Sequence, residues 1–142
     1  MGRIRQATLY WYPPRTLQTV YNSKICISSW GLYAISRTFG GKETLLYVGL
    51  TFDQCFMHRI IKHEMNWFKS YRGTYLVRFG EFQKPCYITK DLVEDVESAL
   101  IYELKPKHNI SKKYSYTFIN RYRVFNIGFR GLLPKEVCML SH

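Results

Sequence analysis

The feature that most constrains the fold of this chain is a pair of aromatic triplets separated by a glycine turn. Gly31-Leu32-Tyr33 begins one apolar run, Tyr47-Val48-Gly49 ends the next, and Gly40-Gly41 lies between them. Short β-rich runs on either side of a glycine-containing polar turn predict a β-hairpin, with strands over 32–35 and 45–48. Glycine and tyrosine are common at strand edges, so the hairpin alone has a purely structural interpretation. Two tyrosines on paired strands could also face one phosphodiester.

Further elements are predicted downstream of the hairpin. A helix is expected over 52–68, followed by a strand over 74–79 that is rich in β-branched and aromatic residues. A second helix is expected to begin at Thr89, a good N-cap residue, and to end near Leu104, before Pro106. The order hairpin, helix, strand, helix indicates an α/β (α+β) fold.

The two ends of the chain are expected to decorate one domain that spans residues 1–142. Pro13 and Pro14 interrupt regular structure, so the segment 1–30 is predicted to be an extended arm laid over the core. The alternating tail over 114–129 is predicted to add one or two strands. A chain of 142 residues suffices for one hydrophobic core.

The net charge of +11 is concentrated at the two ends. Residues 1–30 contain four basic residues and no acidic one, and residues 105–142 contain eight basic residues against Glu136. Basic segments interleaved with tyrosine and phenylalanine suit a nucleic acid, because cations neutralise phosphates and rings stack on bases. A solubilising surface is the alternative interpretation. The basic residues assigned to nucleic-acid binding are Lys107, Lys112, Lys113, Arg121 and Arg123.

The four cysteines form no C-x-x-C pair, which argues against a zinc knuckle and against a disulfide framework. No apolar run is long enough to span a membrane, and the first residues lack the apolar core of a signal peptide. A cytoplasmic protein without a membrane partner is therefore expected.

Polar residues at the borders of the two predicted helices are candidates for chemistry. Arg59 and His63 are four residues apart, so both lie on one edge of the first helix. In the second helix, Glu97 projects onto the apolar arc, where a carboxylate is costly unless a cation or hydrogen bonds compensate it. Glu103 projects onto the same arc and is the second candidate, because water reaches the end of a helix more easily.

These residues together resemble the successive motifs of the GIY-YIG nuclease superfamily, most closely its restriction-enzyme and homing-endonuclease branches. The resemblance covers about residues 31–110, and its motifs are Gly31-Leu32-Tyr33, Tyr47-Val48-Gly49, Arg59 with His63, Glu97, and Pro106-Lys107-His108-Asn109. It implies a small central antiparallel β-sheet flanked by helices, to which this chain adds a basic arm (1–30) and a basic aromatic extension (111–142).

The resemblance also implies an activity, the metal-dependent hydrolysis of DNA phosphodiester bonds, and a role for each site residue. Glu97 would hold one Mg²⁺ or Mn²⁺ ion, and Arg59 would offset the charge that builds on the phosphate. Tyr33 would orient or deprotonate the attacking water with His63 as relay, and Tyr47 would contact a phosphate oxygen. Asn109 would fix the end of the second helix or contact backbone.

The expected partner is DNA, double-stranded by preference, and the enzyme would be restriction-like or of a phage or mobile-element type. One such site cuts one strand, so cutting both requires a homodimer or two successive nicks. The alternative is a catalytically idle nucleic-acid-binding module that retains the GIY-YIG fold.

Overall fold

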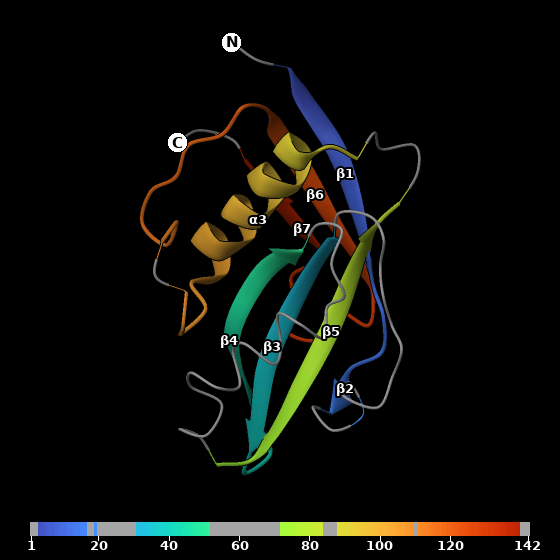
Figure 1. Cartoon of the computed structure of the whole chain (residues 1–142), viewed down its shortest axis with the longest axis vertical. Coiled ribbons are helices and arrows are strands. Elements are labelled where there is room, and N and C mark those ends of the chain that lie inside the picture. Colours follow the sequence, from blue (N-terminus) through green and yellow to red (C-terminus); the bar gives the residue numbers. More distant parts are fainter. Residues whose placement is uncertain are drawn as a thin grey trace.

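The computed structural model describes residues 3–16, 19, 31–51, 72–83, 88–109 and 111–139, and the strands among them form one sheet (Figure 1). The order along the sheet is β4-β3-β5-β1-β6-β7, and β2 pairs with β5. The strands are β1 (Ile4–Trp11), β2 (Arg15–Thr16), β3 (Gly31–Phe39), β4 (Lys42–Thr51), β5 (Thr74–Phe82), β6 (Arg121–Gly128) and β7 (Glu136–Cys138), and the helix is α3 (Lys90–Leu104).

The predicted hairpin is confirmed and its strands are longer than expected. β3 and β4 pair antiparallel along their whole length, from Gly31 opposite Thr51 to Phe39 opposite Lys42. Gly40 and Gly41 form the turn with φ angles of 61° and 78°, a conformation that favours glycine. β5 pairs with the other side of β3, so β3 is an interior strand and β4 is one edge of the sheet, with β7 at the other.

Helix α3 is confirmed with the predicted boundaries. The Thr89 side chain accepts a hydrogen bond from the backbone N–H of Leu92 at 3.2 Å, which caps the first turn. At the other end Lys105 adopts a left-handed conformation and donates to the carbonyl of Ile101, so the helix stops before Pro106. The predicted first helix, over 52–68, lies outside the described residues, as do Arg59 and His63 within it.

The prediction of an N-terminal arm laid over the core is wrong. Residues 4–11 form β1, which lies inside the sheet between β5 and β6. Its alternate side chains Ala7, Leu9 and Trp11 are buried, and the Trp11 indole N–H donates to the Asn126 side chain at 2.9 Å. The prolines only end this strand.

The sheet is larger than the small antiparallel sheet that was expected, and it contains a parallel pair of strands. β1 and β6 run parallel, from Ile4 beside Arg121 to Trp11 beside Gly128, so the sheet is mixed rather than antiparallel. The chain is α+β and dominated by its sheet, and within the described residues one long helix, α3, packs against it (Figure 1). The tail contributes β6, as predicted, whereas 114–120 is irregular.

The hydrophobic core lies between α3 and one face of the sheet. Leu32, Ala34 and Val48 from the hairpin join Val93 and Val96 of the helix in one cluster. Neighbouring residues of a strand point to opposite faces, so Tyr33 leaves β3 on the face away from α3. No helix in the described part of the chain combines the length and the apolar character that a membrane span requires.

Candidate functional site

The two tyrosines of the hairpin lie side by side on the sheet face away from α3. Tyr33 on β3 is directly opposite Gly49 on β4, and Tyr47 is opposite Ile35 on the same face. Their ring centroids are 5.9 Å apart and their planes are inclined by 30°. Tyr33 is fully buried, whereas Tyr47 is partly accessible.

Gly49 is what allows the two rings to occupy this position. A Cβ atom at residue 49 would lie 2.7 Å from both Cζ and the hydroxyl oxygen of Tyr33, and 2.8 Å from Cε2 of Tyr47. Carbon atoms that are not bonded to each other do not approach so closely. The rings therefore lie over a glycine backbone, and any larger residue at position 49 displaces at least one of them.

Asn109 ties the segment after α3 to the outer edge of β4. Its side-chain oxygen accepts from the Val48 N–H at 3.0 Å, and its amide nitrogen donates to the Val48 carbonyl at 2.9 Å. The N–H of His108 also donates to the Leu46 carbonyl at 2.7 Å. Asn109 thus satisfies the backbone N–H and carbonyl of Val48, which face away from β3 and have no strand partner. Val48 lies between Tyr47 and Gly49 in the sequence, so this contact anchors the part of β4 that carries them.

Asn109→Ala is expected to lower the free energy of unfolding by about 2–4 kcal/mol, because it removes the side-chain partner of two buried backbone groups. Chemical denaturation measures the change. The control is Asn120→Ala, at a position where the backbone N–H, rather than the side chain, bonds to Asp95. Equal stability of the two variants would contradict this role of Asn109.

Glu97 is buried on α3 and paired with a cation. The residue is 8% exposed, and its Oε1 lies 2.6 Å from the ammonium of Lys112. Val93 and Ile101, one turn before and after it, are buried apolar residues, so the carboxylate sits at the border of the core. Glu103, the second candidate on the same helix, is exposed. The exposure of Glu103 agrees with its place near the helix end, which is why it ranks second, although helical projection alone did not distinguish the two residues.

The donor chemistry of Glu97 is compatible with a single hard cation. A carboxylate oxygen is the ligand type that Mg²⁺ prefers, and Mg²⁺ in proteins commonly keeps several waters and binds through one or two carboxylates plus substrate phosphate. Lys112 already places a positive charge at this carboxylate, so a metal ion would have to displace its ammonium. Within the described residues, no group of three His, Cys, Asp or Glu side chains could form a metal cage.

The sheet lies between the tyrosines and the helix that carries Glu97. Tyr33 and Tyr47 project from one face, and α3 packs on the other through Leu32, Ala34 and Val48. A phosphodiester that contacted both Glu97 and the tyrosines would therefore have to lie at the β4 edge of the sheet.

The basic residues assigned to nucleic-acid binding have different environments. Lys112 is engaged with Glu97, and Arg123 pairs with Glu136 at 3.0 Å. Lys107 is exposed, and the Lys113 ammonium donates to its carbonyl. Arg121 lies over the ring of Phe118, 5.5 Å from its centroid. His108 follows Lys107 in the sequence. Burial and the charges of Lys107 and Lys113 lower the pKa of the His108 imidazole, which favours its neutral form near pH 7.

A second ion pair, which is partly buried and which the sequence did not predict, holds the hairpin to β5. Arg78 donates to Glu43 at 2.6 Å, and the Ser36 hydroxyl donates to the same carboxylate oxygen at 2.6 Å. Burial alone would raise the pKa of Glu43, but the bonds from Ser36 and Arg78 and the charge of Arg78 outweigh it and lower the pKa. The pair braces the hairpin strands that carry the tyrosines.

Two partners in this site were missed from sequence. Lys112 follows α3 with a φ of 70°, and its contact with Glu97 joins residues 15 positions apart in the sequence. Val48 was recognised as a motif residue, but its edge position, and hence its need for Asn109, depends on the strand order.

Comparisons with protein families, with curated proteins and with solved structures find no match.

Proposed function

We propose that this chain is a metal-dependent endonuclease that hydrolyses DNA phosphodiester bonds with a GIY-YIG-type site. The observation that carries the proposal is the pair of adjacent tyrosine rings over Gly49. A close ring pair over a glycine on an edge hairpin is what the two aromatic triplets would need in order to face one phosphate. The basic ends and the buried Glu97 add support.

Each residue has a role that follows from its chemistry. The Tyr47 hydroxyl, on the more accessible ring, would donate to a phosphate oxygen. Tyr33 is fully buried, so it would orient the attacking water only once its hydroxyl becomes accessible on substrate binding. Arg59 would donate to the non-bridging oxygens and His63 would relay the proton. Glu97 would hold Mg²⁺ or Mn²⁺ once Lys112 is displaced. The bound ion would supply positive charge to the leaving oxygen.

One contact favours the alternative of a catalytically idle module that binds nucleic acid and retains this fold. The Lys112 ammonium already neutralises the Glu97 carboxylate at 2.6 Å, an arrangement that satisfies a buried acid without any metal. In that case the chain would bind nucleic acid with strong salt dependence and would not cleave it.

Cleavage of supercoiled plasmid with Mg²⁺ is expected for the wild-type protein, with complete loss in EDTA. Tyr33→Phe is expected to lower the rate by about 100-fold, a typical contribution of a group that positions or deprotonates water. Tyr114→Phe is the matched control, because Tyr114 is 79% exposed and outside the site. Nicked and linear products are quantified on gels. Binding without cleavage at any Mg²⁺ or Mn²⁺ concentration would establish the idle module instead.

A further inference from the structure

Strands β1 and β6 begin beside each other, at the end of the sheet near the N-terminus (Figure 1). The parallel pairing of the two strands places Ile4 beside Arg121. Arg3 and Arg5, on either side of Ile4, are therefore next to a residue more than 110 positions away in the sequence. All three arginines line one cavity at this end of the sheet, and we call them the arginine cluster (Arg3, Arg5 and Arg121).

The arginine cluster lines a hollow surface. One cavity of about 320 Å³ is bounded by Arg3, Arg5, Phe118, Ile119, Asn120 and Arg121. A second, of about 500 Å³, shares Arg3 and Arg5 and is completed by Ile4 and Gln6. Every charged side chain that lines either cavity is an arginine. Arginine presents a planar group of N–H donors that matches phosphate or carboxylate oxygens, so this hollow suits a ligand with such an anionic group.

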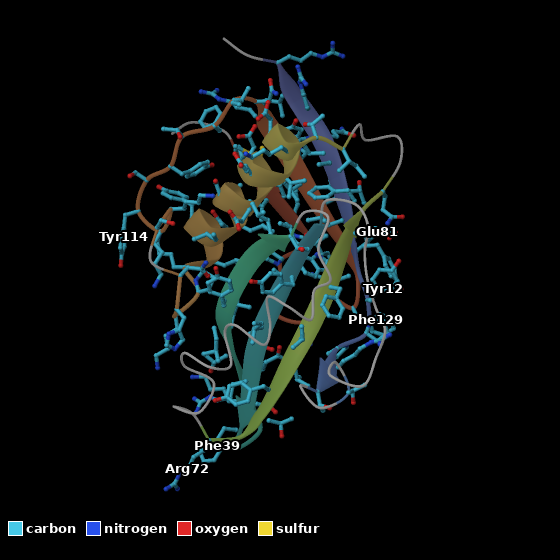
Figure 2. The ribbon with its side chains drawn as sticks, in the orientation of Figure 1. Tyr12, Phe39, Arg72, Glu81, Tyr114 and Phe129 are labelled. Atoms are coloured by element: carbon cyan, nitrogen blue, oxygen red, sulfur yellow. The ribbon has the colours of Figure 1, made fainter. Side chains whose placement is uncertain are left out.

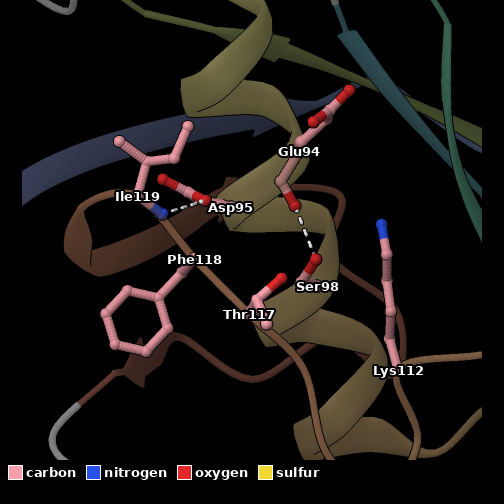
Figure 3. Close-up of a pocket in the computed structure, with 7 residues that line it drawn as sticks. All are labelled: Glu94, Asp95, Ser98, Lys112, Thr117, Phe118 and Ile119. Carbon is pink, nitrogen blue, oxygen red and sulfur yellow. Dashed lines mark hydrogen bonds between the residues drawn. The ribbon is translucent and has the colours of Figure 1, made fainter.

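The opposite wall of the hollow is held in place by α3. Both carboxylate oxygens of Asp95 accept backbone N–H groups, from Ile119 at 3.0 Å and from Asn120 at 2.9 Å. Figure 3 shows this bond to Ile119, with Phe118 next along the segment. Asp95 is 3% exposed and does not line either cavity. The wall is thus positioned before any ligand binds.

Apolar side chains lie beside the arginines. Ile119 is 66% exposed and Ile4 is 40% exposed, although both are large and hydrophobic. The Phe118 ring already lies under the guanidinium of Arg121. A surface that alternates guanidinium groups with apolar and aromatic side chains suits a strand whose phosphates and bases also alternate.

We propose that the arginine cluster binds the sugar-phosphate backbone of a nucleic-acid strand and serves as an anchor outside the tyrosine and Glu97 site. The choice of a nucleic acid rests on the proposed function, because the hollow itself specifies only an anionic group beside apolar groups. The anchor extends the binding surface to Arg5 of β1 and to Arg3, which immediately precedes this strand.

Binding of a fluorescently labelled 20-nucleotide single strand and of the matching duplex, followed by anisotropy in EDTA, tests the anchor. The variant Arg3→Ala/Arg5→Ala/Arg121→Ala is expected to bind at least about 10-fold more weakly near 0.1 M salt. The slope of log Kd against log salt should fall by about 2–3, since each lost phosphate contact removes about 0.7–0.9. The single reversal Arg5→Glu should weaken binding in the same direction.

The matched control removes the same charge elsewhere, in Lys42→Ala/Arg72→Ala/Lys135→Ala. These three residues are exposed, and Figure 2 shows Arg72 near Phe39, at the far end of the molecule from the N-terminus. Control binding within about 2-fold of wild type supports the anchor. Equal losses in both triple variants would overturn it in favour of diffuse charge. Binding to anionic phosphatidylserine vesicles is measured in parallel. If the arginine variant lost vesicle binding but bound nucleic acid like wild type, the anchor would also be overturned.

The same experiment separates this inference from the proposed nuclease activity. EDTA removes the metal, so binding is measured without cleavage. A protein that binds through the arginine cluster but never cleaves supports the anchor and overturns the nuclease proposal. If the wild-type protein cleaves, and the arginine variant binds and cleaves like wild type, the result supports the nuclease proposal and overturns the anchor.

Discussion

Glu97→Gln is expected to abolish Mg²⁺-dependent cleavage, with a rate loss of about 100-fold or more. Removing a residue that merely supports a metal ligand typically costs about 10–100-fold, and Glu97 is proposed to be the ligand itself. The fold should survive, because the glutamine amide oxygen can still accept from Lys112. Plasmid nicking gives the rate, and circular dichroism checks the fold. Glu103→Gln, an exposed position on the same helix, should cleave normally.

Titration with Mn²⁺ in the absence of nucleic acid separates a metal ligand from a structural ion pair. If Glu97 only pairs with Lys112, then Glu97→Gln and Lys112→Met break one contact and neither creates or removes metal binding. If Glu97 holds the ion, Glu97→Gln should remove Mn²⁺ binding, whereas Lys112→Met should strengthen it because the competing ammonium is gone. Indistinguishable Mn²⁺ titrations of the two variants would reject Glu97 as the metal ligand.

Gly49→Ala is expected to destabilise the protein by about 1–3 kcal/mol and to remove cleavage activity. The new methyl group would lie 2.7 Å from the Tyr33 hydroxyl oxygen, and Tyr33 is fully buried, so its ring has little room to move. At about 3 °C per kcal/mol for a chain of this length, the Tm should fall by roughly 3–10 °C. Thermal denaturation followed by circular dichroism measures the shift.

A double-mutant cycle shows whether the clash with Tyr33 is the cause. Tyr33→Leu removes the Cζ and hydroxyl atoms of Tyr33 that the new Cβ would meet, at the expense of a cavity, and leaves the contact with Cε2 of Tyr47. The double variant should therefore be less destabilised than the two single variants predict together, by roughly 0.5–3 kcal/mol. Strict additivity would place the effect of Gly49→Ala elsewhere than the tyrosine pair.

Local signals were sufficient for the elements that close within a short stretch of chain. The hairpin follows from two glycines with positive φ between strand-forming runs, and α3 follows from the cap at Thr89 and the stop before Pro106. The burial of Glu97 follows from the same helical periodicity, because a helix that packs on a sheet buries one arc. Glu103 shares that arc but lies beyond the packed region, which periodicity cannot show.

Pairings between distant segments were not predictable in this way. β1 was predicted to be a surface arm because Pro13 and Pro14, which follow it, interrupt regular structure. Its alternate residues Ala7, Leu9 and Trp11 are nevertheless buried. A strand's alternation identifies a buried face but not the neighbour that covers its edge. The parallel partner of β1 lies more than 110 residues away, and such pairing depends on the whole sheet.

Residue type and local periodicity were enough to select the candidate groups: the tyrosine triplets, the carboxylate on an apolar arc, and the basic ends. These properties do not depend on distant contacts. Which of the groups meet depends on the three-dimensional fold. It set Tyr33 and Tyr47 over Gly49, joined Asn109 to Val48 and Lys112 to Glu97, and brought Arg3 and Arg5 beside Arg121. Those contacts arise from strand order and chain reversal, in which each segment is placed by the hydrogen bonds and buried surface of all the others.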